Sequence, residues 1–201
     1  MSSPEAPASA RWGVEALDRF YRWQAPIYDW TRPFFLFGRA AALAALDARP
    51  GDRVIDVGCG TGWSAVRLAA AGARVTGIEP AAPMRARARV RAPRVRLDAR
   101  PYGTHGEHRN AAERILFSYS LSMIPPFRDV IDRARQDLRP GGRIVVVDFL
   151  DARAPFHAWL THSHVFLGPQ RLDALRTAFP AHRVRLRNAF GWRFFQFVAE
   201  A

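Results

Sequence analysis

The chain has one cysteine, no lysine and no long apolar run among its 201 residues. Its single cysteine, Cys59, excludes an internal disulfide and suits the reducing cytoplasm. No apolar run reaches the ~20 residues that a transmembrane helix needs. Residues 1–10 lack the basic start and the apolar block of a signal peptide, so we expect them to be a disordered tail. These absences predict a cytoplasmic protein.

Arginine takes the place of the missing lysine and accounts for all 30 basic residues, against 18 acidic ones. Codon usage in a GC-rich genome explains the choice of arginine, but it leaves the net charge of +12 unexplained. An excess of this size favours an anionic partner, either nucleic acid or an anionic membrane surface. Apolar residues make up 49% of the chain, and no repeat or second domain is visible. Residues 11–201 therefore predict one α/β domain with a sizeable core.

The most informative stretch runs from Val54 to Gly62 and reads Val-Ile-Asp-Val-Gly-Cys-Gly-Thr-Gly. Its β-branched start predicts a buried parallel strand, and its glycines predict a turn in which a ligand lies against the main chain. A helical pattern over 63–71 and a second β-branched run over 73–78 follow, and that run ends at Glu79. This is a βαβ unit with an acid about 20 residues beyond its first glycine, where a carboxylate suits the hydroxyls of a ribose.

Both NAD and S-adenosylmethionine (SAM) carry such a ribose, and Asp56 separates the two. It lies two residues before the first glycine, where an NAD fingerprint has an apolar residue. The spacing D-x-G-C-G-T-G resembles motif I of class I SAM-dependent methyltransferases, with Glu79 at the position of their ribose-binding acid. The resemblance implies a Rossmann-like fold, with SAM as cofactor and S-adenosylhomocysteine as product. An NAD site and a purely structural turn remain the alternatives.

The rest of the chain continues to alternate between helical and β-branched segments. This alternation predicts a doubly wound, seven-stranded, mostly parallel α/β sheet with helices on both faces. The expected strands are 54–57, 73–78, 94–97, 114–119, 144–149, 183–186 and 194–199. The expected helices after motif I are 63–71, 80–91, 127–138, 154–164 and 169–179.

In such sheets a ligand lies over the carboxyl ends of the strands. Met84 could pack on an adenine ring, although methionine at a helix start is more often core. Asp98, at the end of the third strand, could accept a hydrogen bond from the adenine amino group, as the matching family position does. The predicted cofactor-binding residues are Asp56, Gly58, Cys59, Gly60, Gly62, Glu79, Pro80, Met84, Asp98, Ala99, Ser118 and Tyr119.

Residues 11–46 predict a helical cover over this edge of the sheet. A first helix, over 11–24, has one charged side and a broad aromatic side, and it should end at Ala25-Pro26 because proline disfavours helix in the residue before it. A second, apolar helix over 34–46 follows Pro33. The first helix either packs on the core or lies in a lipid interface, with its tryptophans at head-group depth.

Methyl transfer from a sulfonium is a single in-line displacement, so catalysis comes mainly from orienting the reactants and excluding water. An amine acceptor must be neutral when it attacks, and Asp29 is the predicted acceptor of its proton. The face of Tyr28 can hold a methylated ammonium by cation–π attraction, although a core tyrosine is the alternative. Tyr28 and Asp29 are therefore the predicted catalytic residues. No metal site is expected, because no cluster has ligand spacing.

A narrower resemblance rests on the blocks 21–32, 35–39, 118–125 and 140–149, which read Tyr-Arg-Trp-Gln-Ala-Pro-Ile-Tyr-Asp-Trp-Thr-Arg, Phe-Leu-Phe-Gly-Arg, Ser-Tyr-Ser-Leu-Ser-Met-Ile-Pro and Pro-Gly-Gly-Arg-Ile-Val-Val-Val-Asp-Phe. Together with the segment 164–172, they are similar to bacterial diacylglyceryl-homoserine N-methyltransferases, which add three methyl groups to make a betaine lipid. Related phosphatidylethanolamine methyltransferases share motif I, so the resemblance predicts the reaction more firmly than the head group.

The resemblance covers about residues 20–199, but the loop 98–112 and Ser163 depart from it. Structural roles are the alternative for two of the acceptor-side residues, with His164 a structural histidine and Arg171 a solvated helix residue. The predicted substrate-binding residues are Tyr21, Arg32, Ser122, Met123, His164 and Arg171.

The leading hypothesis is a SAM-dependent N-methyltransferase that acts on a lipid amine and binds peripherally to the inner face of an anionic membrane. A soluble methyltransferase acting on a small amine or a quinone is the first alternative. An RNA methyltransferase or RNA-binding protein would use the same basic charge, but no RNA-binding module is appended, so nucleic acid is disfavoured as a partner. The last alternative is a non-catalytic homologue that serves as a scaffold.

Overall fold

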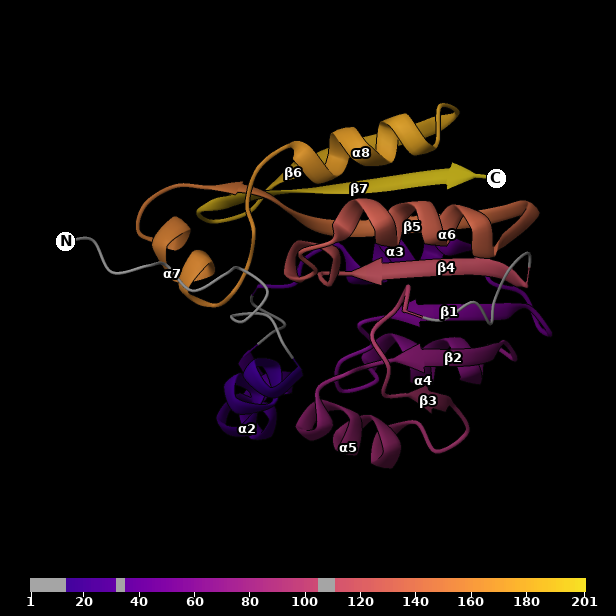
Figure 1. Ribbon diagram of the computed structural model, residues 1–201, viewed down its shortest axis with the longest axis horizontal. Coiled ribbons are helices and arrows are strands. Elements are labelled where there is room, and N and C mark those ends of the chain that lie inside the picture. The colour runs from indigo at the N-terminus through magenta and orange to yellow at the C-terminus, as the bar shows by residue number, and fades with distance from the viewer. Residues whose placement is uncertain (1–13, 32–34, 105–110) are drawn as a thin grey trace.

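The protein, analysed as a computed structural model, is described over residues 14–31, 35–104 and 111–201 (Figure 1). Its centre is a seven-stranded sheet in the order β3-β2-β1-β4-β5-β7-β6, in which β7 runs antiparallel to β5 and β6 and the other neighbours are parallel. The predicted doubly wound, mostly parallel sheet is confirmed. The strands are β1 (Arg53–Val57), β2 (Arg74–Ile78), β3 (Arg96–Asp98), β4 (Ala112–Ser118), β5 (Leu138–Ala152), β6 (His182–Asn188) and β7 (Trp192–Glu200).

Helices cover both faces of the sheet because the central strands bury side chains on both sides. In β5, Ile144 and Val146 belong to one core cluster with residues of α6 and α8, whereas Val145 and Val147 belong to the other cluster with residues of α3 and α4. None of the helices in the described part of the chain is long and apolar enough to cross a membrane. The helices are α2 (Val14–Thr31), α3 (Arg39–Leu46), α4 (Trp63–Ala70), α5 (Ala82–Arg91), the 3₁₀ turn η2 (Leu121–Met123), α6 (Phe127–Asp137), α7 (Phe156–His162) and α8 (Gln170–Ala178).

The parallel strands end at one edge of the sheet, at the left in Figure 1. The central three strands are level there, because Asp56 of β1 pairs in register with Gly77 of β2 and with Leu116 of β4. α2 lies beside this edge and packs on α5. The small apolar cluster between them contains Tyr21, Ala25, Ala81 and Met84.

The first helix is longer than predicted, because α2 continues through Pro26 rather than ending there. Two hydrogen bonds hold it against α5. Asp18 Oδ1 accepts one from the Ala82 N–H (2.6 Å), and the Ala25 carbonyl accepts one from Arg87 Nε (2.7 Å). Tertiary packing of the inner face thus outweighs the local preference of proline.

The second helix is shorter than predicted, since α3 begins at Arg39 rather than at residue 34. Gly38 precedes it in the left-handed conformation (φ +80°), and a Cβ there would lie only 2.8 Å from Phe194. The aromatic residues before Gly38 therefore lie outside the helix, and Phe35 stacks on Trp192 with ring centroids 5.6 Å apart.

The fifth strand extends well beyond the predicted 144–149 and includes the glycine-containing segment 139–142. The reason is distant in sequence: the Gly141 N–H donates to the Ala201 carbonyl (2.7 Å), and the Ala201 N–H donates to the Gly142 carbonyl (2.9 Å). The other predicted elements are confirmed with ends shifted by at most two residues. The predicted tail, residues 1–10, lies outside the described residues.

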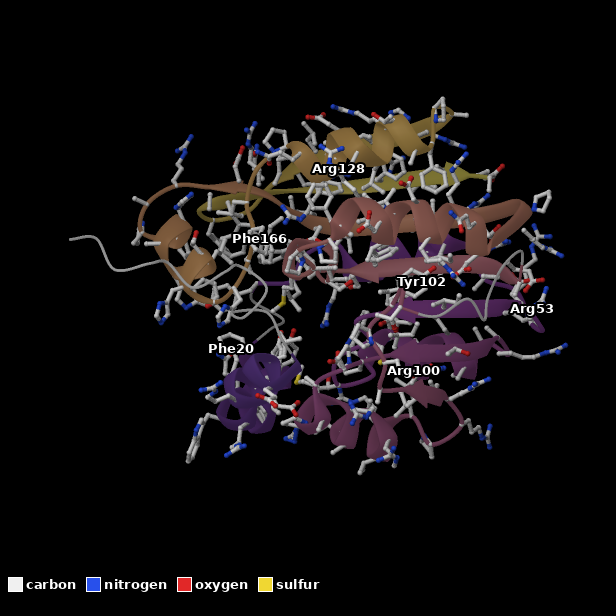
Figure 2. The ribbon with its side chains drawn as sticks, viewed as in Figure 1. Phe20, Arg53, Arg100, Tyr102, Arg128 and Phe166 are labelled. Atoms are coloured by element: carbon white, nitrogen blue, oxygen red, sulfur yellow. The ribbon has the colours of Figure 1, made fainter. Side chains whose placement is uncertain are left out.

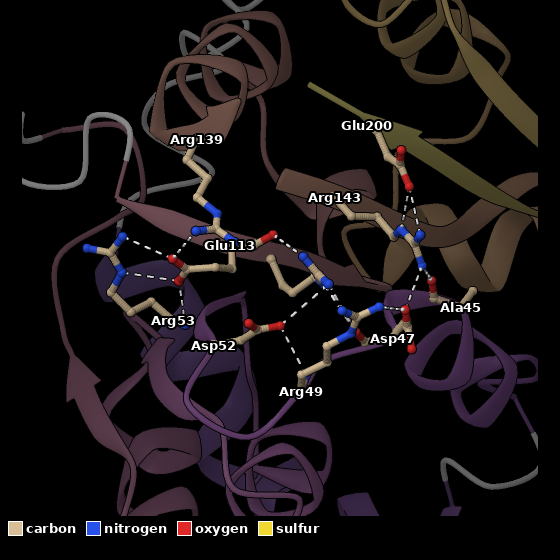
Figure 3. A network of polar contacts seen from close by, with 10 residues as sticks. Ala45, Asp47, Arg49, Asp52, Arg53, Glu113, Arg139, Arg143 and Glu200 are labelled. Atoms are coloured by element: carbon tan, nitrogen blue, oxygen red, sulfur yellow. Dashed lines mark hydrogen bonds and ion pairs between the residues drawn. The ribbon is translucent and has the colours of Figure 1, made fainter. Parts of the chain in front are cut away.

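The opposite edge of the sheet carries a network of ion pairs (Figure 3). Glu113 accepts hydrogen bonds from the main chain and the guanidinium of Arg53 and lies 3.3 Å from Arg139 Nη1. Arg143 joins Glu200 (2.7 Å) to Asp47 (3.6 Å). The network ties the starts of β1 and β4 and the first half of β5 to the loop after α3, so part of the arginine excess is structural.

Candidate cofactor and acceptor site

The turn after β1 brings main-chain groups to the carboxyl edge of the sheet. Gly58 (φ +69°) donates its N–H to the Ile78 carbonyl (2.8 Å), and a Cβ on Gly58 would clash with Ser120, whose hydroxyl donates to the Val57 carbonyl (2.6 Å). Gly60 (φ +58°) is less crowded, since a Cβ there would meet only the tip of Met84 at an ordinary 3.5 Å. Gly58 therefore allows the close approach of β1 and β4, whereas the main chain of Gly60 is open to a ligand.

Glu79 ties the end of β2 to this turn. The side chain is buried (7% exposed); its Oε2 accepts a hydrogen bond from the Gly60 N–H and its Oε1 accepts one from the Ala81 N–H, both at 2.9 Å. Burial raises the pKa of Glu79 to about 7, although the two backbone hydrogen bonds oppose this shift. Each carboxylate oxygen can accept a second hydrogen bond. Glu79 can therefore still receive a ligand hydroxyl.

Asp56 is buried completely and is only partly satisfied. Its Oδ2 accepts a hydrogen bond from the Ser64 hydroxyl (2.6 Å), whereas its Oδ1 has no hydrogen-bond partner in the described part of the chain. Burial raises the pKa of Asp56 to about 6, and the hydrogen bond from Ser64 and the charge of Arg39 oppose this shift. A buried acceptor without a donor is unfavourable by about 1–3 kcal/mol. A ligand that donates a hydrogen bond to Oδ1 would remove this penalty.

Arg39, at the start of α3, is a site residue that sequence reasoning missed. Its charge counteracts the burial that raises the pKa values of Asp56 and Tyr119. Its guanidinium carbon also lies 4.2 Å from the ring centroid of Trp63, which Arg67 contacts at 4.0 Å. Its place in the block 35–39 was the available signal, because nothing in the glycine motif points to a residue so far upstream.

Asp98, the predicted partner of an adenine amino group, is engaged by a neighbour. Its Oδ1 accepts hydrogen bonds from the N–H (2.9 Å) and Nε (3.1 Å) of Arg100, and its Oδ2 accepts one from Nη2 (2.7 Å). The bonds from the Arg100 side chain are the main cause that lowers the pKa of Asp98 to about 2. The carboxylate is therefore ionised at neutral pH, and a ligand would share it with Arg100.

The other predicted cofactor-binding residues lie around the same edge. Met84 is buried beside Gly60, and the Tyr119 hydroxyl donates to the Phe37 carbonyl (2.7 Å). The Cys59 thiol packs on β2, since a Cβ on Gly77 would lie 2.8 Å from its Sγ, and burial raises the pKa of this thiol. Ser118 is the last residue of β4, Ala99 directly follows β3, and Pro80 is the second residue after β2. Gly62 directly precedes α4.

The acceptor side is an aromatic wall built from α2 and the turn after β4. The Tyr21 hydroxyl donates to Met123 Sδ (3.2 Å), and the Tyr21 ring meets the Tyr28 ring edge-on with centroids 6.0 Å apart. Phe20, which rises from α2 in Figure 2, meets the His164 ring edge-on with centroids 4.9 Å apart. The structure thus brings together four of the residues predicted for catalysis and substrate binding.

Two buried side chains of opposite charge, Asp148 and Arg171, support this wall from behind. Asp148, fully buried, accepts a hydrogen bond from the Ser122 N–H (2.7 Å), and Phe166 donates its N–H to the Ser122 carbonyl (2.8 Å). Arg171 is 5% exposed and donates to the carbonyls of Leu121 and Phe166, both at 3.1 Å. The alternative of a solvated Arg171 is therefore wrong, since the side chain is held inside. Asp148 was not predicted as a site residue.

Two predicted residues are beyond what the structure describes. Arg32 lies outside the described residues, and Asp29 lies in α2 with its side chain outside them. Within the described ranges, no group of three His, Cys, Asp or Glu residues could hold a metal ion.

The groups at the cofactor edge are those that an adenosyl amino acid can satisfy. The Oδ1 of Asp56 lacks a hydrogen-bond donor in the described residues. Glu79 can accept hydrogen bonds from hydroxyl groups in addition to those from the main chain. At Gly60 a ligand can lie against the main chain, because the glycine has no side chain to cover it. An ammonium group and a ribose supply these donors, so the expected cofactor fits the residues present.

Comparisons with known proteins agree with this description. Residues 31–191 match the family described as a methyltransferase domain. The 27-O-demethylrifamycin SV methyltransferase of Amycolatopsis mediterranei is 35% identical over 117 residues, which are 55% of this chain and 43% of that protein. The demethylmenaquinone methyltransferase of Beutenbergia cavernae is 32% identical over 137 residues, 65% of this chain and 57% of that protein. The chain spans about half the length of these curated relatives.

A solved structure with a similar fold is phosphoethanolamine N-methyltransferase 2 of Haemonchus contortus, in complex with phosphomonomethylethanolamine and S-adenosylhomocysteine. The TM-score is 0.74 at 16% identity, and the match covers 92% of this chain and 60% of that one. At this identity the likeness concerns the fold.

Proposed function

The chain belongs to the methyltransferase domain family, and from this premise we propose that it transfers methyl groups from SAM to the amine head group of a membrane lipid. Family membership confirms the predicted class of SAM-dependent methyltransferase domain. The lipid amine is the further step. Bound SAM supplies a methyl group on a sulfonium, which is already activated for in-line displacement.

On the cofactor side, we assign the ribose hydroxyls to Glu79 and the ammonium of the methionine part to Asp56. We assign the carboxylate of the methionine part to Arg39, whose charge also acts on Asp56. The main chain at Gly60 lies against the ligand, and Met84 packs beside it. These assignments provide the missing donor for Asp56 Oδ1.

The observation that carries the amine acceptor is the aromatic wall next to the glycine turn. Tyr21, Tyr28 and Met123 join α2 to the turn after β4, and Met84 connects this cluster to Gly60. Aromatic faces attract methylated ammonium groups through cation–π attraction. An amine that gains successive methyl groups would therefore be held at the wall, and we propose that Asp29 receives its proton.

The lipid part of the proposal draws on the similarity of the blocks 21–32 and 118–125 to lipid N-methyltransferases and on the basic excess of the chain. A head group at an anionic membrane surface would reach the site from the edge where α2 lies. We propose that the protein binds peripherally to this surface in the cytoplasm.

Methyl-labelled SAM tests the proposal directly. The purified protein is incubated with vesicles of phosphatidylethanolamine, vesicles that contain diacylglyceryl-homoserine, and soluble phosphoethanolamine. Label is expected in one of the lipid fractions. Tyr28→Ala should raise the KM for the lipid on the order of tenfold, whereas Tyr28→Phe, which keeps the aromatic face, should change it little. A protein that binds SAM in a calorimeter but labels neither lipid refutes the lipid amine.

A soluble quinone is the second candidate acceptor, because a demethylmenaquinone methyltransferase is among the relatives. The aromatic wall could equally stack on a flat ring. Label in demethylmenaquinone, with none in the amine-containing lipids, would favour this candidate.

A further inference from the structure

We propose that the acceptor end of the molecule is a docking surface for an anionic lipid bilayer, formed by exposed aromatic side chains from three separate elements. They are Trp23 and Trp30 of α2, Trp159 of α7 and Phe190 of the turn between β6 and β7. This inference rests on the proposed function, because the bilayer would be the source of the lipid acceptor.

The four aromatic side chains are unusually open to solvent. Trp23 is 82% exposed, Trp30 is 83% exposed, Phe190 is 85% exposed, and Trp159 is 38% exposed. Trp23 and Trp30 lie two helical turns apart, so they share one side of α2. The opposite side of α2 is the one that packs on α5 through Tyr21 and the residues around it. Aromatic residues left in water at such positions mark an interaction site.

The three elements lie at the same end of the molecule (Figure 1). β6 runs parallel to β5, so the turn after β6 lies at the same edge as the cofactor site, and α7 follows the end of β5 (Figure 1). Phe35 contacts Trp159 (5.0 Å between centroids), and Phe37 contacts Phe190 (6.0 Å). The segment before α3 therefore links α7 to the β6–β7 turn directly beside the acceptor wall.

The β6–β7 turn presents Phe190 from a rigid base. A Cβ on the next residue, Gly191, would clash with the ring of Phe156, which shows how closely α7 approaches the turn. Trp192 then anchors the start of β7, since its ring contacts Phe149 (6.4 Å) and Phe156 (5.3 Å). The exposed ring of Phe190 is thus held outward by a packed aromatic cluster.

The charges at this end favour an anionic bilayer over a second protein. Exposed arginines flank the aromatic residues on each element: Arg19 and Arg22 on α2, Arg153 before α7 and Arg187 near the end of β6. The acids with described side chains on the same elements are fewer: Glu15 and Asp18 of α2, and Asp151, which pairs with Arg193. Tryptophan and phenylalanine beside arginine is the composition that binds at the boundary of head groups and acyl chains. A second copy of this chain would bring arginine against arginine.

Vesicle binding of two paired variants tests the surface. The variants are Trp23→Ala with Trp30→Ala, and Trp159→Ala with Phe190→Ala. Each pair should lower co-sedimentation with phosphatidylglycerol vesicles on the order of tenfold, because interfacial affinity follows the apolar area that enters the bilayer. Binding should fall with salt and be much weaker to phosphatidylcholine vesicles. Phe190→Ala alone repeats the test without touching the partly packed Trp159.

Two other exposed apolar residues provide matched controls. Val90 of α5 is 85% exposed and Leu186 of β6 is 52% exposed, and neither belongs to the proposed surface. Val90→Ala and Leu186→Ala should leave vesicle binding within about twofold of the original protein. Circular dichroism and calorimetric SAM binding should be unchanged in every variant, because none of these side chains contacts the cofactor edge.

Three results would overturn the docking surface. The first is equal vesicle binding by all variants, and the second is weaker binding of the α2 double variant without any effect of Phe190→Ala. The third is a change from dimer to monomer in sedimentation with no change in vesicle binding. Methyl transfer to lipid dispersed in detergent micelles separates this inference from the proposed function. Transfer in micelles together with one of these three results refutes the surface alone. Vesicle binding through the surface, with no transfer to any lipid, refutes the lipid acceptor alone.

Discussion

We expect Asp56→Asn to change the free energy of unfolding of the cofactor-free protein in a pH-dependent way. The free energy of unfolding of the variant, minus that of the original protein, should be larger at pH 8 than at pH 4. Asp56 is fully buried, its Oδ1 has no partner in the described residues, and burial raises its pKa from 3.8 to about 6. Asparagine has nearly the same shape and can keep the hydrogen bond from Ser64. The substitution therefore removes the charge and little else.

The sign follows from the pKa values of the folded and unfolded chain. Below pH 3.8 the carboxyl is protonated in both states and contributes no pH-dependent difference; above about pH 6 it is ionised in both, and burial of the charge destabilises the fold. A shift from 3.8 to about 6 corresponds to about 3 kcal/mol of stability lost as the pH rises through this window. Asparagine does not titrate, so the variant does not lose this stability as the pH rises.

Urea unfolding followed by circular dichroism between pH 4 and pH 8, without SAM, measures the difference between the two proteins. The free energy of unfolding of the variant minus that of the original protein should increase by about 3 kcal/mol across the range. Calorimetry at pH 8 should meanwhile show SAM affinity reduced on the order of tenfold to a hundredfold, as expected when a charged hydrogen-bond acceptor is removed. A difference that stays constant from pH 4 to pH 8 would refute a raised pKa at Asp56.

Other changes follow from the same contacts. Glu79→Gln places an amide group against the N–H of Gly60 or Ala81 and should weaken SAM binding at least tenfold in calorimetry; unchanged affinity would argue against the ribose assignment. Gly58→Ala should destabilise the fold by about 2–4 kcal/mol through strain and the clash with Ser120, whereas Gly141→Ala, also at positive φ but in open space, should destabilise it by about 1 kcal/mol in the same urea titration. Arg171→Leu removes the cation whose charge acts on the buried Asp148 carboxylate, together with two hydrogen bonds to carbonyls, and the loss of about 3 kcal/mol should shrink at pH 5, where Asp148, with a pKa of about 6, is largely protonated; an equal loss at pH 5 and pH 8 would contradict the electrostatic part of this effect.

Local patterns were sufficient for the sheet and the glycine turn because their determinants are adjacent in sequence. The β-branched run at 54–57 and the glycines after it specify a strand and a turn without any distant partner. Where a distant contact decides, the prediction was wrong. The pairing of Gly141 and Gly142 with Ala201 extends β5, and the contacts of Ala25 and Asp18 with α5 carry α2 through Pro26.

The candidate site divides along the same line. Glu79 and Asp56 could be predicted because their spacing from the glycines is part of a local motif. Arg39 and Asp148 lie in the blocks 35–39 and 140–149, but their roles could not be predicted, since each role comes from residues brought close only by folding: Asp56 in one case, and Ser122 and Arg171 in the other. Charged residues that interact across the fold are far apart in sequence, so no sequence pattern indicates that they interact.

The distribution of charge connects the fold to the proposed membrane surface. Codon usage can explain arginine throughout the chain. The acidic residues that neutralise its charge, however, are distributed unevenly between the two edges of the sheet. At the amino edge of the sheet, Glu113, Asp52, Asp47 and Glu200 engage arginines in the network of Figure 3. At the carboxyl edge, the central acids Asp56 and Glu79 are buried toward the cofactor, and Asp148 is buried behind the acceptor wall. On the elements at this edge, the arginines Arg19, Arg22, Arg153 and Arg187 are exposed, and Glu15 and Asp18 of α2 offset them only in part. In the proposed membrane-bound state, a polarity of this kind would orient the molecule with the proposed acceptor site toward the lipid, because the field attracts one end of the protein more than the other.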